Sequence, residues 1–209
     1  MNTTNVAMFV SNSGCNTNLG HLLPAGVLAA MRIKSAKFPV LLTNKPFPYI
    51  FEKIIKPFIA IEVVDHKEFD TREAFEAEVI RRLEKYNIGL VVLAGFLRIL
   101  TPYFLNHYKN KVINIHPGLL PSFTGINATQ QALDYGVKIA GCTAHFVDEG
   151  VDTGPIILQA TVPVKEDDSE HSLLRRIFRE EIRIIFKAIE LFCEGRLFVS
   201  GRKVTIKLN

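Results

Sequence analysis

The sequence contains few cysteines, no tryptophan and no long apolar run. Its three cysteines, Cys15, Cys142 and Cys193, are odd in number, widely spaced and without a CxxC pair. This argues against a disulfide framework and favours a reducing compartment. No stretch approaches the roughly 20 apolar residues of a membrane helix, and the first residues lack the basic region and apolar run of a signal peptide. We therefore expect a cytoplasmic protein with no membrane partner.

Charge of one sign is not concentrated anywhere in the chain. The formal net charge is +4, but acidic and basic residues are interspersed, with no run of lysine or arginine. Nucleic acid is therefore not an expected partner, whereas a mildly basic surface suits small anionic substrates. The 209 residues, 48% hydrophobic and 22% charged, are enough for one globular domain with a full core.

Apolar segments of strand length alternate with helical patterns in the first half of the sequence. Strands are predicted at residues 5–10, 38–42, 59–64 and 88–94, and helices at 19–31, 71–86 and 101–107, with a short helix between the second and third strands. The apolar stripe of the 71–86 helix is expected at Ala74, Phe75, Val79 and Leu83, with Asp70 or Thr71 as its cap.

The second half has a different pattern. We expect a strand through Asn114, a helix ending near Gly136, two strands within 138–164, a long helix at 169–194 and a terminal hairpin around Gly201. The whole order predicts an α/β fold of Rossmann type, a doubly wound, mostly parallel sheet with an antiparallel C-terminal edge. Residues 1–209 are expected to form a single domain.

The segment KVINIHPGLLP, residues 111–121, joins an apolar strand to a loop that contains proline. Asn114 and His116 are two residues apart, so both side chains project from one face of the strand. Pro117 keeps His116 extended, at the end of a strand where ligands bind in open α/β sheets. An amide donor beside an imidazole suits acyl-type transfer, in which an oxyanion develops while a proton moves. The alternative is a structural histidine and an asparagine that fixes a turn.

The glycine-punctuated turn HFVDEGVDTGP, residues 145–155, contains three carboxylates. It is either a solvated hairpin or the source of a carboxylate for the site. If Asp152 faces His116, it favours the imidazolium form and raises the pKa of that histidine. His116, His145 and Asp152 are a conceivable zinc set, but their spacing matches no standard zinc motif, so we expect no metal.

Two further loops follow predicted strands. Residues 11–16, SNSGCN, place a glycine turn before a helix, where unpaired N–H groups suit a phosphate; this is neither GxGxxG nor a Walker A sequence, and a plain polar connection is the alternative. Residues 94–100, AGFLRIL, contain Gly95, which permits close backbone approach, and the peptides of 97–100 can hydrogen-bond a heteroaromatic ring. The alternative there is an apolar loop that covers the core.

Taken together, these segments resemble the formyltransferase family that uses 10-formyltetrahydrofolate. The most specific segments are NIHPGLLP and HFVDEGVDTGPIILQ, while AGFLRIL and FDTREAF (residues 69–75) resemble more narrowly its phosphoribosylglycinamide formyltransferase branch. The resemblance covers nearly the whole chain in the same order. It implies formyl transfer to the amine of glycinamide ribonucleotide in de novo purine biosynthesis, with the formyl-folate as co-substrate, no metal, and a monomer or homodimer.

The resemblance also implies roles for individual residues. Asn114, His116 and Asp152 would be catalytic: Asn114 donates to the developing oxyanion, protonated His116 stabilises it, and Asp152 maintains that protonation state. Folate contacts are implied for Arg72, Leu97, Arg98, Ile99, Leu100, Asn114, Asp148, Glu149, Gly150, Val151 and Asp152. Ribonucleotide contacts are implied for Gly14, Cys15, Asn16, Pro117, Gly125 and Glu181. The N-terminal half would carry the ribonucleotide side and the C-terminal half the folate side.

The sequence departs from the family pattern only on the ribonucleotide side. The departures are Asn12, Cys15, Thr17, Asn127, Thr129 and the segment 182–186. Within the same fold, a methionyl-tRNA formyltransferase would need an added C-terminal domain and a formyltetrahydrofolate deformylase an added N-terminal one, so the length argues against both. A hydrolase remains the alternative enzyme, and a non-catalytic folate-binding protein is the alternative from another class.

Overall fold

The computed structural model describes residues 3–11, 32–46 and 49–207. They fall into two compact units, residues 1–112 and 113–209, each described here by itself. The helix predicted at 19–31 lies outside the described residues.

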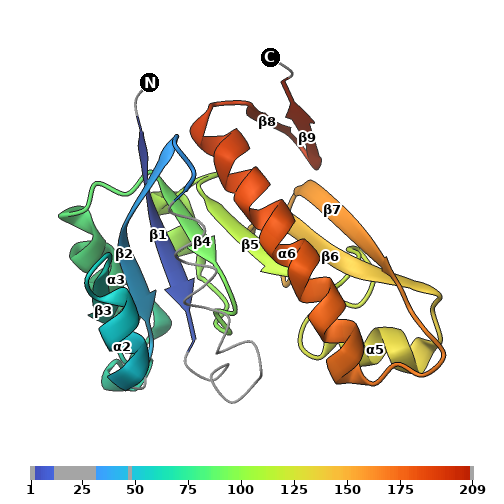
Figure 1. The fold of residues 1–209 in the computed structure, drawn as a ribbon. Helices are drawn as coiled ribbons and strands as arrows, with labels where there is room; N and C mark the ends of the chain where they lie inside the picture. The colour runs from blue at the N-terminus through green and yellow to red at the C-terminus, as the bar shows by residue number, and fades with distance from the viewer. Residues whose placement is uncertain (1–2, 12–31, 47–48, 208–209) are drawn as a thin grey trace. The chain divides into compact units, whose positions relative to one another are not determined.

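The first unit is built on a parallel sheet of four strands in the order β3-β2-β1-β4 (Figure 1). These are β1 (Thr4–Val10), β2 (Ala36–Thr43), β3 (Ala60–Val63) and β4 (Leu90–Leu93), and every neighbouring pair is parallel. All four residues of β4 are buried, as are the last five of β1. Continuous apolar runs of this kind belong to parallel strands covered on both faces, so the predicted strands are confirmed with slightly different ends.

Helices of the first unit follow the predicted positions. They are α2 (Tyr49–Ile55), the 3₁₀ turn η2 (His66–Glu68), α3 (Arg72–Glu84) and α4 (Pro102–His107). Thr71 is the cap of α3, and its hydroxyl accepts from the N–H of Ala74 at 3.1 Å. The expected apolar stripe is partly wrong, because Ala74 is exposed and Glu76 is buried. The inward face of α3 is centred one residue later than the apolar pattern indicates.

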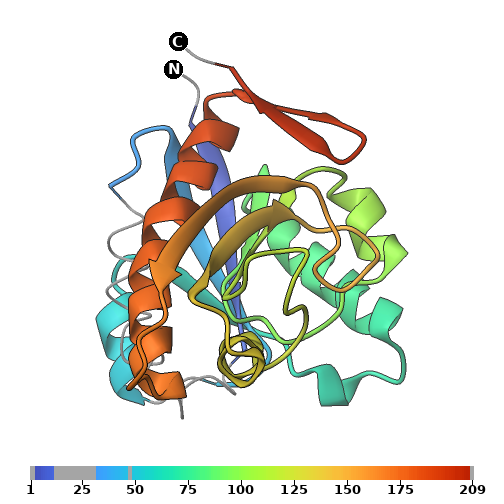
Figure 2. The same cartoon turned by 90° about the vertical axis from the view of Figure 1, so that its right-hand side faces the viewer.

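The second unit contains five strands in the order β5-β6-β7-β9-β8. They are β5 (Val112–His116), β6 (Ile139–Phe146), β7 (Ile156–Pro163), β8 (Leu197–Ser200) and β9 (Lys203–Ile206). The pairs β5–β6, β6–β7 and β8–β9 are antiparallel, and β7–β9 is parallel. The predicted pair of strands and the terminal hairpin around Gly201 are therefore confirmed, and Figure 2 shows the hairpin beyond the end of α6.

Two helices complete the second unit, α5 (Ala128–Tyr135) and α6 (Glu170–Cys193). A capping box between Ser169 and Ser172 starts α6, and Gly136, at φ 78°, ends α5 in the left-handed conformation that glycine tolerates. The buried face of α6 includes Leu173 and Ile177 and packs on β6 and β7 (Figure 1).

The parallel strands of the first unit and the antiparallel strands of the second confirm the predicted α/β class with its antiparallel C-terminal part. That residues 1–209 act as a single domain stays a prediction. Within the described ranges, no helix has the length and apolar character needed to cross a membrane.

Candidate active site

The structure brings Asn114, His116 and Asp152 together within the second unit. Asn114 and His116 lie on β5, and Asp152 follows in the turn between β6 and β7 with a left-handed φ of 55°. The Nδ1 atom of His116 lies 3.2 Å from Oδ2 of Asp152, and the Nδ2 group of Asn114 donates to Oδ1 of Asp152 at 3.5 Å. The two side chains on the same face of β5 therefore both contact the carboxylate that the β6–β7 turn supplies.

Asp152 is held in its ionised form by its neighbours. Burial alone would raise the pKa of its carboxyl group, but the neighbouring His145 and His116 imidazoles and the hydrogen bond from the Gly125 N–H lower that pKa below its usual value. The bond from the Gly125 N–H to Oδ2 measures 2.8 Å. Gly125, expected to line the substrate, thus also ties the loop after β5 to the carboxylate.

The protonation of His116 differs from the prediction. Burial lowers the pKa of this imidazole, and the opposing effects of the Asp152 charge and of the Phe123 carbonyl do not overcome it, so the net pKa lies below its ordinary value. The Asp152 charge therefore raises the pKa of His116 as expected, but burial, which was not considered, outweighs it. His116 is only 3% exposed, and its Nε2 atom lies 2.7 Å from the Phe123 carbonyl oxygen. Both ring nitrogens face a hydrogen-bond acceptor, Asp152 at Nδ1 and the Phe123 carbonyl at Nε2. The neutral resting ring can therefore take up a proton and donate at both nitrogens.

His145 is a member of this cluster whose role the sequence analysis missed. It lies opposite Asn114 in the β5–β6 register. Its Nδ1–H donates to the Phe146 carbonyl at 2.8 Å, so the neutral ring has its lone pair on Nε2. That atom lies 3.3 Å from Asn114 Nδ2 and 3.6 Å from Asp152 Oδ1. His145 therefore helps to determine which way the Asn114 amide points.

Two glycines keep the cluster closely packed. A Cβ atom at Gly118 would lie 2.8 Å from His116 Nε2 and 3.1 Å from the Phe123 carbonyl oxygen. A Cβ at Gly154 would lie 1.8 Å from the Phe146 carbonyl oxygen, the acceptor of His145. All three distances are shorter than van der Waals contact, so the two positions require glycine. Among the described residues no group of three or more histidine, cysteine or acidic side chains is arranged to hold a metal ion.

The predicted pterin-binding loop lies in the first unit, between β4 and α4. Its Leu97 and Ile99 side chains are 65% and 53% exposed, while Phe96 and Leu100 are buried. The Leu97 N–H donates to the Ser11 hydroxyl at 3.0 Å. Within the described part of the chain, the peptide groups of residues 98–100 have no hydrogen-bond partner. Exposed apolar side chains beside peptides that no other described residue pairs with suit a planar heteroaromatic ligand.

Positive charge accumulates beside this loop. Arg72 is the first residue of α3, and its charge contributes, after burial, to a lowered pKa of the Arg98 guanidinium. Arg98 also lies over the Phe75 ring, 5.5 Å from its centroid. Because the Arg72 charge adds to the effect of burial on Arg98, an anionic ligand beside these two side chains would be stabilising.

The turn 148–152 presents mostly main chain and small side chains. Oδ1 of Asp148 accepts from the Gly150 N–H at 3.2 Å and from the Thr153 hydroxyl at 2.6 Å, which fixes the turn. Glu149 and Gly150 are exposed, and Val151 is 48% exposed. The structure thus places Glu149, Gly150 and Val151 of the predicted folate turn at the surface, between the half-buried Asp148 and Asp152.

Ribonucleotide contacts are only partly visible. Gly14, Cys15 and Asn16 lie outside the described residues. Pro117 is half-buried directly after β5. Glu181 is 9% exposed on α6, and burial raises the pKa of its carboxyl group to about 7.

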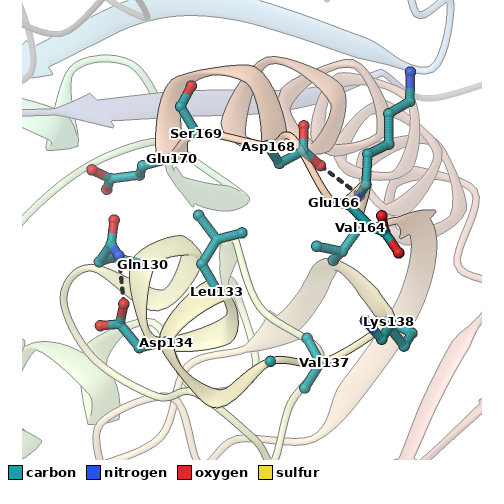
Figure 3. A pocket seen from close by; sticks show the side chains of 12 residues that line it. Gln130, Leu133, Asp134, Val137, Lys138, Val164, Glu166, Asp168, Ser169 and Glu170 are labelled. Atoms are coloured by element: carbon teal, nitrogen blue, oxygen red, sulfur yellow. Dashed lines mark hydrogen bonds between the residues drawn. The ribbon is translucent and has the colours of Figure 1, made fainter.

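A surface hollow of about 400 Å³ lies elsewhere in the second unit, between the end of α5 and the start of α6 (Figure 3). None of its lining residues belongs to the predicted site. Its polar groups are engaged with each other: Gln130 donates to Asp134 at 2.6 Å, and Asp168 accepts from the Lys165 N–H at 2.8 Å. This hollow is therefore distinct from the cluster around Asp152.

The geometry agrees with what comparison with known proteins finds. Residues 4–189 match the family model described as formyl transferase. This chain belongs to the formyl transferase family. The predicted resemblance is thereby confirmed.

Three relatives show which branch of the family is similar. The phosphoribosylglycinamide formyltransferase of Escherichia coli is 36% identical over 92% of this chain and 89% of its own length. A solved glycinamide ribonucleotide transformylase 1 from Symbiobacterium toebii is 40% identical, with a TM-score of 0.87 over 98% of this chain and 94% of that one. The trifunctional purine biosynthetic protein adenosine-3 of Drosophila melanogaster is 39% identical over 93% of this chain, but the chain spans only 14% of its length.

A fourth similarity concerns the alternative reaction. A solved formyltetrahydrofolate deformylase from Pseudomonas syringae pv. tomato is 28% identical, with a TM-score of 0.83 over 98% of this chain and 66% of that one. Formyl transfer and deformylation therefore occur on closely similar folds, so the chemistry of the site residues has to distinguish the two reactions.

Proposed function

We propose that this chain transfers the formyl group of 10-formyltetrahydrofolate to the amine of glycinamide ribonucleotide, giving formylglycinamide ribonucleotide and tetrahydrofolate. The observation that carries the proposal is the convergence of Asn114 and His116 on the Asp152 carboxylate, at 3.5 and 3.2 Å. The similarity to glycinamide ribonucleotide transformylases supports the choice of acceptor.

The proposed reaction forms one C–N bond and breaks another. The neutral amine attacks the formyl carbon, and the carbonyl oxygen becomes an oxyanion that accepts a hydrogen bond from the Asn114 amide. The amine proton moves to the neutral His116, whose imidazolium the Asp152 carboxylate stabilises. The folate N10–C bond then breaks as that proton is delivered to N10, so one proton leaves the amine and one reaches the folate. Use of His116 Nε2 requires that its contact with the Phe123 carbonyl be exchanged for the substrate.

In the same proposal, the folate binds through the loop 97–100 and the turn 148–152. The unpaired peptides of 98–100 would bind the pterin, and the two guanidinium groups of Arg72 and Arg98 would favour its anionic glutamate. Pro117, Gly125 and Glu181, with Gly14, Cys15 and Asn16, would bind the ribonucleotide. Glu181 would accept from a ribose hydroxyl group.

The decisive experiment supplies 10-formyltetrahydrofolate with and without glycinamide ribonucleotide and follows both deformylated folate and the formylated ribonucleotide. We expect folate turnover that depends on the ribonucleotide and yields one formylated product for each folate consumed. Formate release at the same rate without the ribonucleotide would instead show a deformylase, the second candidate, which the similarity to the Pseudomonas protein supports. Folate binding with no turnover under either condition would show a non-catalytic binding protein.

A further inference from the structure

The folate loop is anchored by a buried carboxylate on a neighbouring helix. Glu76, on α3, is 2% exposed. Its Oε1 atom accepts from the Thr101 N–H at 2.8 Å, and its Oε2 atom accepts from the Thr101 hydroxyl. Thr101 directly follows the loop 94–100 and precedes α4. Both oxygens of a buried charge are thus used at the point where the loop ends.

The anchor replaces an ordinary helix cap. Thr101 is the N-cap residue of α4, but its side chain makes no capping bond to that helix; its hydroxyl instead donates to Glu76. A buried carboxylate is costly unless hydrogen bonds compensate it, and charge-assisted bonds are the strong ones. Burying the Glu76 carboxylate here therefore costs stability. A Thr101 side chain that capped α4 directly would avoid that cost.

The other end of the loop is fixed independently. The Ala94 N–H donates to the Phe9 carbonyl at 2.9 Å, and the Leu97 N–H donates to the Ser11 hydroxyl at 3.0 Å. The Phe96 ring packs edge-on against Phe9, with centroids 5.4 Å apart. Between these contacts and Thr101, residues 98–100 have no backbone hydrogen bond to any described residue, so they are positioned by the two ends together with the Arg98 contact on the Phe75 ring and the buried Leu100 side chain.

We propose that Glu76 is a positioning residue of the folate site, which acts through Thr101 to hold the peptides of residues 98–100 in the conformation that receives the pterin. The inference rests on the proposed function, since it assigns the ligand of this loop. It predicts that loss of the anchor weakens folate binding specifically, because ligand binding must then restore the order that the anchor supplies.

The test uses Glu76→Gln, which removes the charge and one of the two acceptor oxygens, Thr101→Val, which removes the hydroxyl donor at nearly the same size, and Thr101→Ser, which retains the hydroxyl. For the first two variants we expect roughly a tenfold higher KM for formyl-folate, the size typical of one lost hydrogen bond to a charged group. Their kcat at saturating folate and their KM for the ribonucleotide should stay within about twofold of wild type, since the anchor touches neither. Thr101→Ser should bind folate like the parent protein.

Two further measurements separate this inference from a general loss of stability and from the proposed function. Glu84→Gln removes an exposed carboxylate from the far end of the same helix and should leave both KM values unchanged. The Kd of folate, measured without an acceptor, tests the anchor even if the wild type proves to be a hydrolase. Equal rises in both KM values, or wild-type folate affinity in a folded Thr101→Val variant, would overturn the inference. A wild type that binds no folate would overturn the proposed function itself.

Discussion

The Nδ1 atom of His116 lies 3.2 Å from Oδ2 of Asp152, with both side chains largely buried. Burial lowers the pKa of the imidazole, and the carboxylate charge acts against that effect. The ease with which His116 accepts a proton therefore depends on the balance between burial and this neighbouring charge. The substitutions below test that dependence and the contacts that support it.

Asp152→Asn removes the charge while retaining an oxygen that can accept from the Gly125 N–H. We expect kcat to fall by about 10²–10⁴-fold, the range for loss of a group that assists proton transfer. The pKa of His116, followed by NMR titration of its ring, should fall further below its ordinary value, because a charge that raises it is lost. Folate affinity, measured in parallel, tests whether the loss is confined to the chemical step.

The control is Asp167→Asn, which removes an exposed carboxylate from the same unit and should change neither kcat nor the titration. Asn114→Ala should show a loss of kcat comparable to Asp152→Asn, because it removes the oxyanion donor. If both Asn114→Ala and Asp152→Asn bind folate and turn over like the wild type, the catalytic assignment is wrong.

His145 should matter through the Asn114 amide. His145→Ala removes the acceptor at 3.3 Å from Asn114 Nδ2, which frees the amide to rotate, and we expect roughly a tenfold lower kcat for a misoriented donor. In His145→Gln, the side-chain oxygen can take the place of Nε2, so this variant should recover most of the rate. Steady-state kinetics of the two variants provide the comparison. Equal losses in both would show that His145 does not act by orienting Asn114.

Gly118→Ala should displace the His116 ring without removing any functional group. The added methyl would lie 2.8 Å from His116 Nε2, so the ring must move. A displacement of this kind typically costs about 10²-fold in rate, and we expect that loss in kcat. The NMR signals of the His116 ring should shift while the protein stays folded. A folded variant with unchanged kcat would show that the ring position is not critical.

Much of this architecture could be predicted from local pattern. The spacing of two between Asn114 and His116 requires a shared face in any strand, and the long apolar runs at β1 and β4 could form only buried strands. These inferences succeed because they depend on neighbours in the sequence. The turn containing Asp152 was predicted as a candidate only, since nothing local shows what a turn faces.

The errors share a physical origin in contacts between distant residues. Glu76 was not expected on the buried face of α3, because its partner Thr101 is 25 residues away and hydropathy alone excludes a carboxylate. The Asp152 charge raises the pKa of His116 as predicted, but the burial of the ring, which local sequence does not reveal, makes the net pKa lower than its ordinary value. His145 was considered only as a metal ligand, since its tautomer depends on a backbone carbonyl that only the fold identifies.

Glu181, proposed to bind the ribose, has a cost in stability. Its pKa is raised from 4.5 to about 7 by burial, so the folded state binds more protons than the unfolded state between those values. Stability from this group is thus fully present below about pH 4.5 and is lost as the pH rises to about 7. A shift of this size corresponds to about 3 kcal/mol at higher pH, at 1.36 kcal/mol per pKa unit.

Glu181→Gln should therefore have opposite effects on stability and on substrate binding. The free energy of unfolding at pH 8, from denaturant titration, should rise by up to about 3 kcal/mol relative to wild type, and the gain should vanish near pH 4.5. The KM for glycinamide ribonucleotide should rise roughly tenfold for the loss of a charged acceptor at the ribose, with the folate KM unchanged. A stability gain without a change in either KM would remove Glu181 from the ribonucleotide site. A destabilised variant at pH 8 would show instead that the ionised carboxylate has a compensating partner.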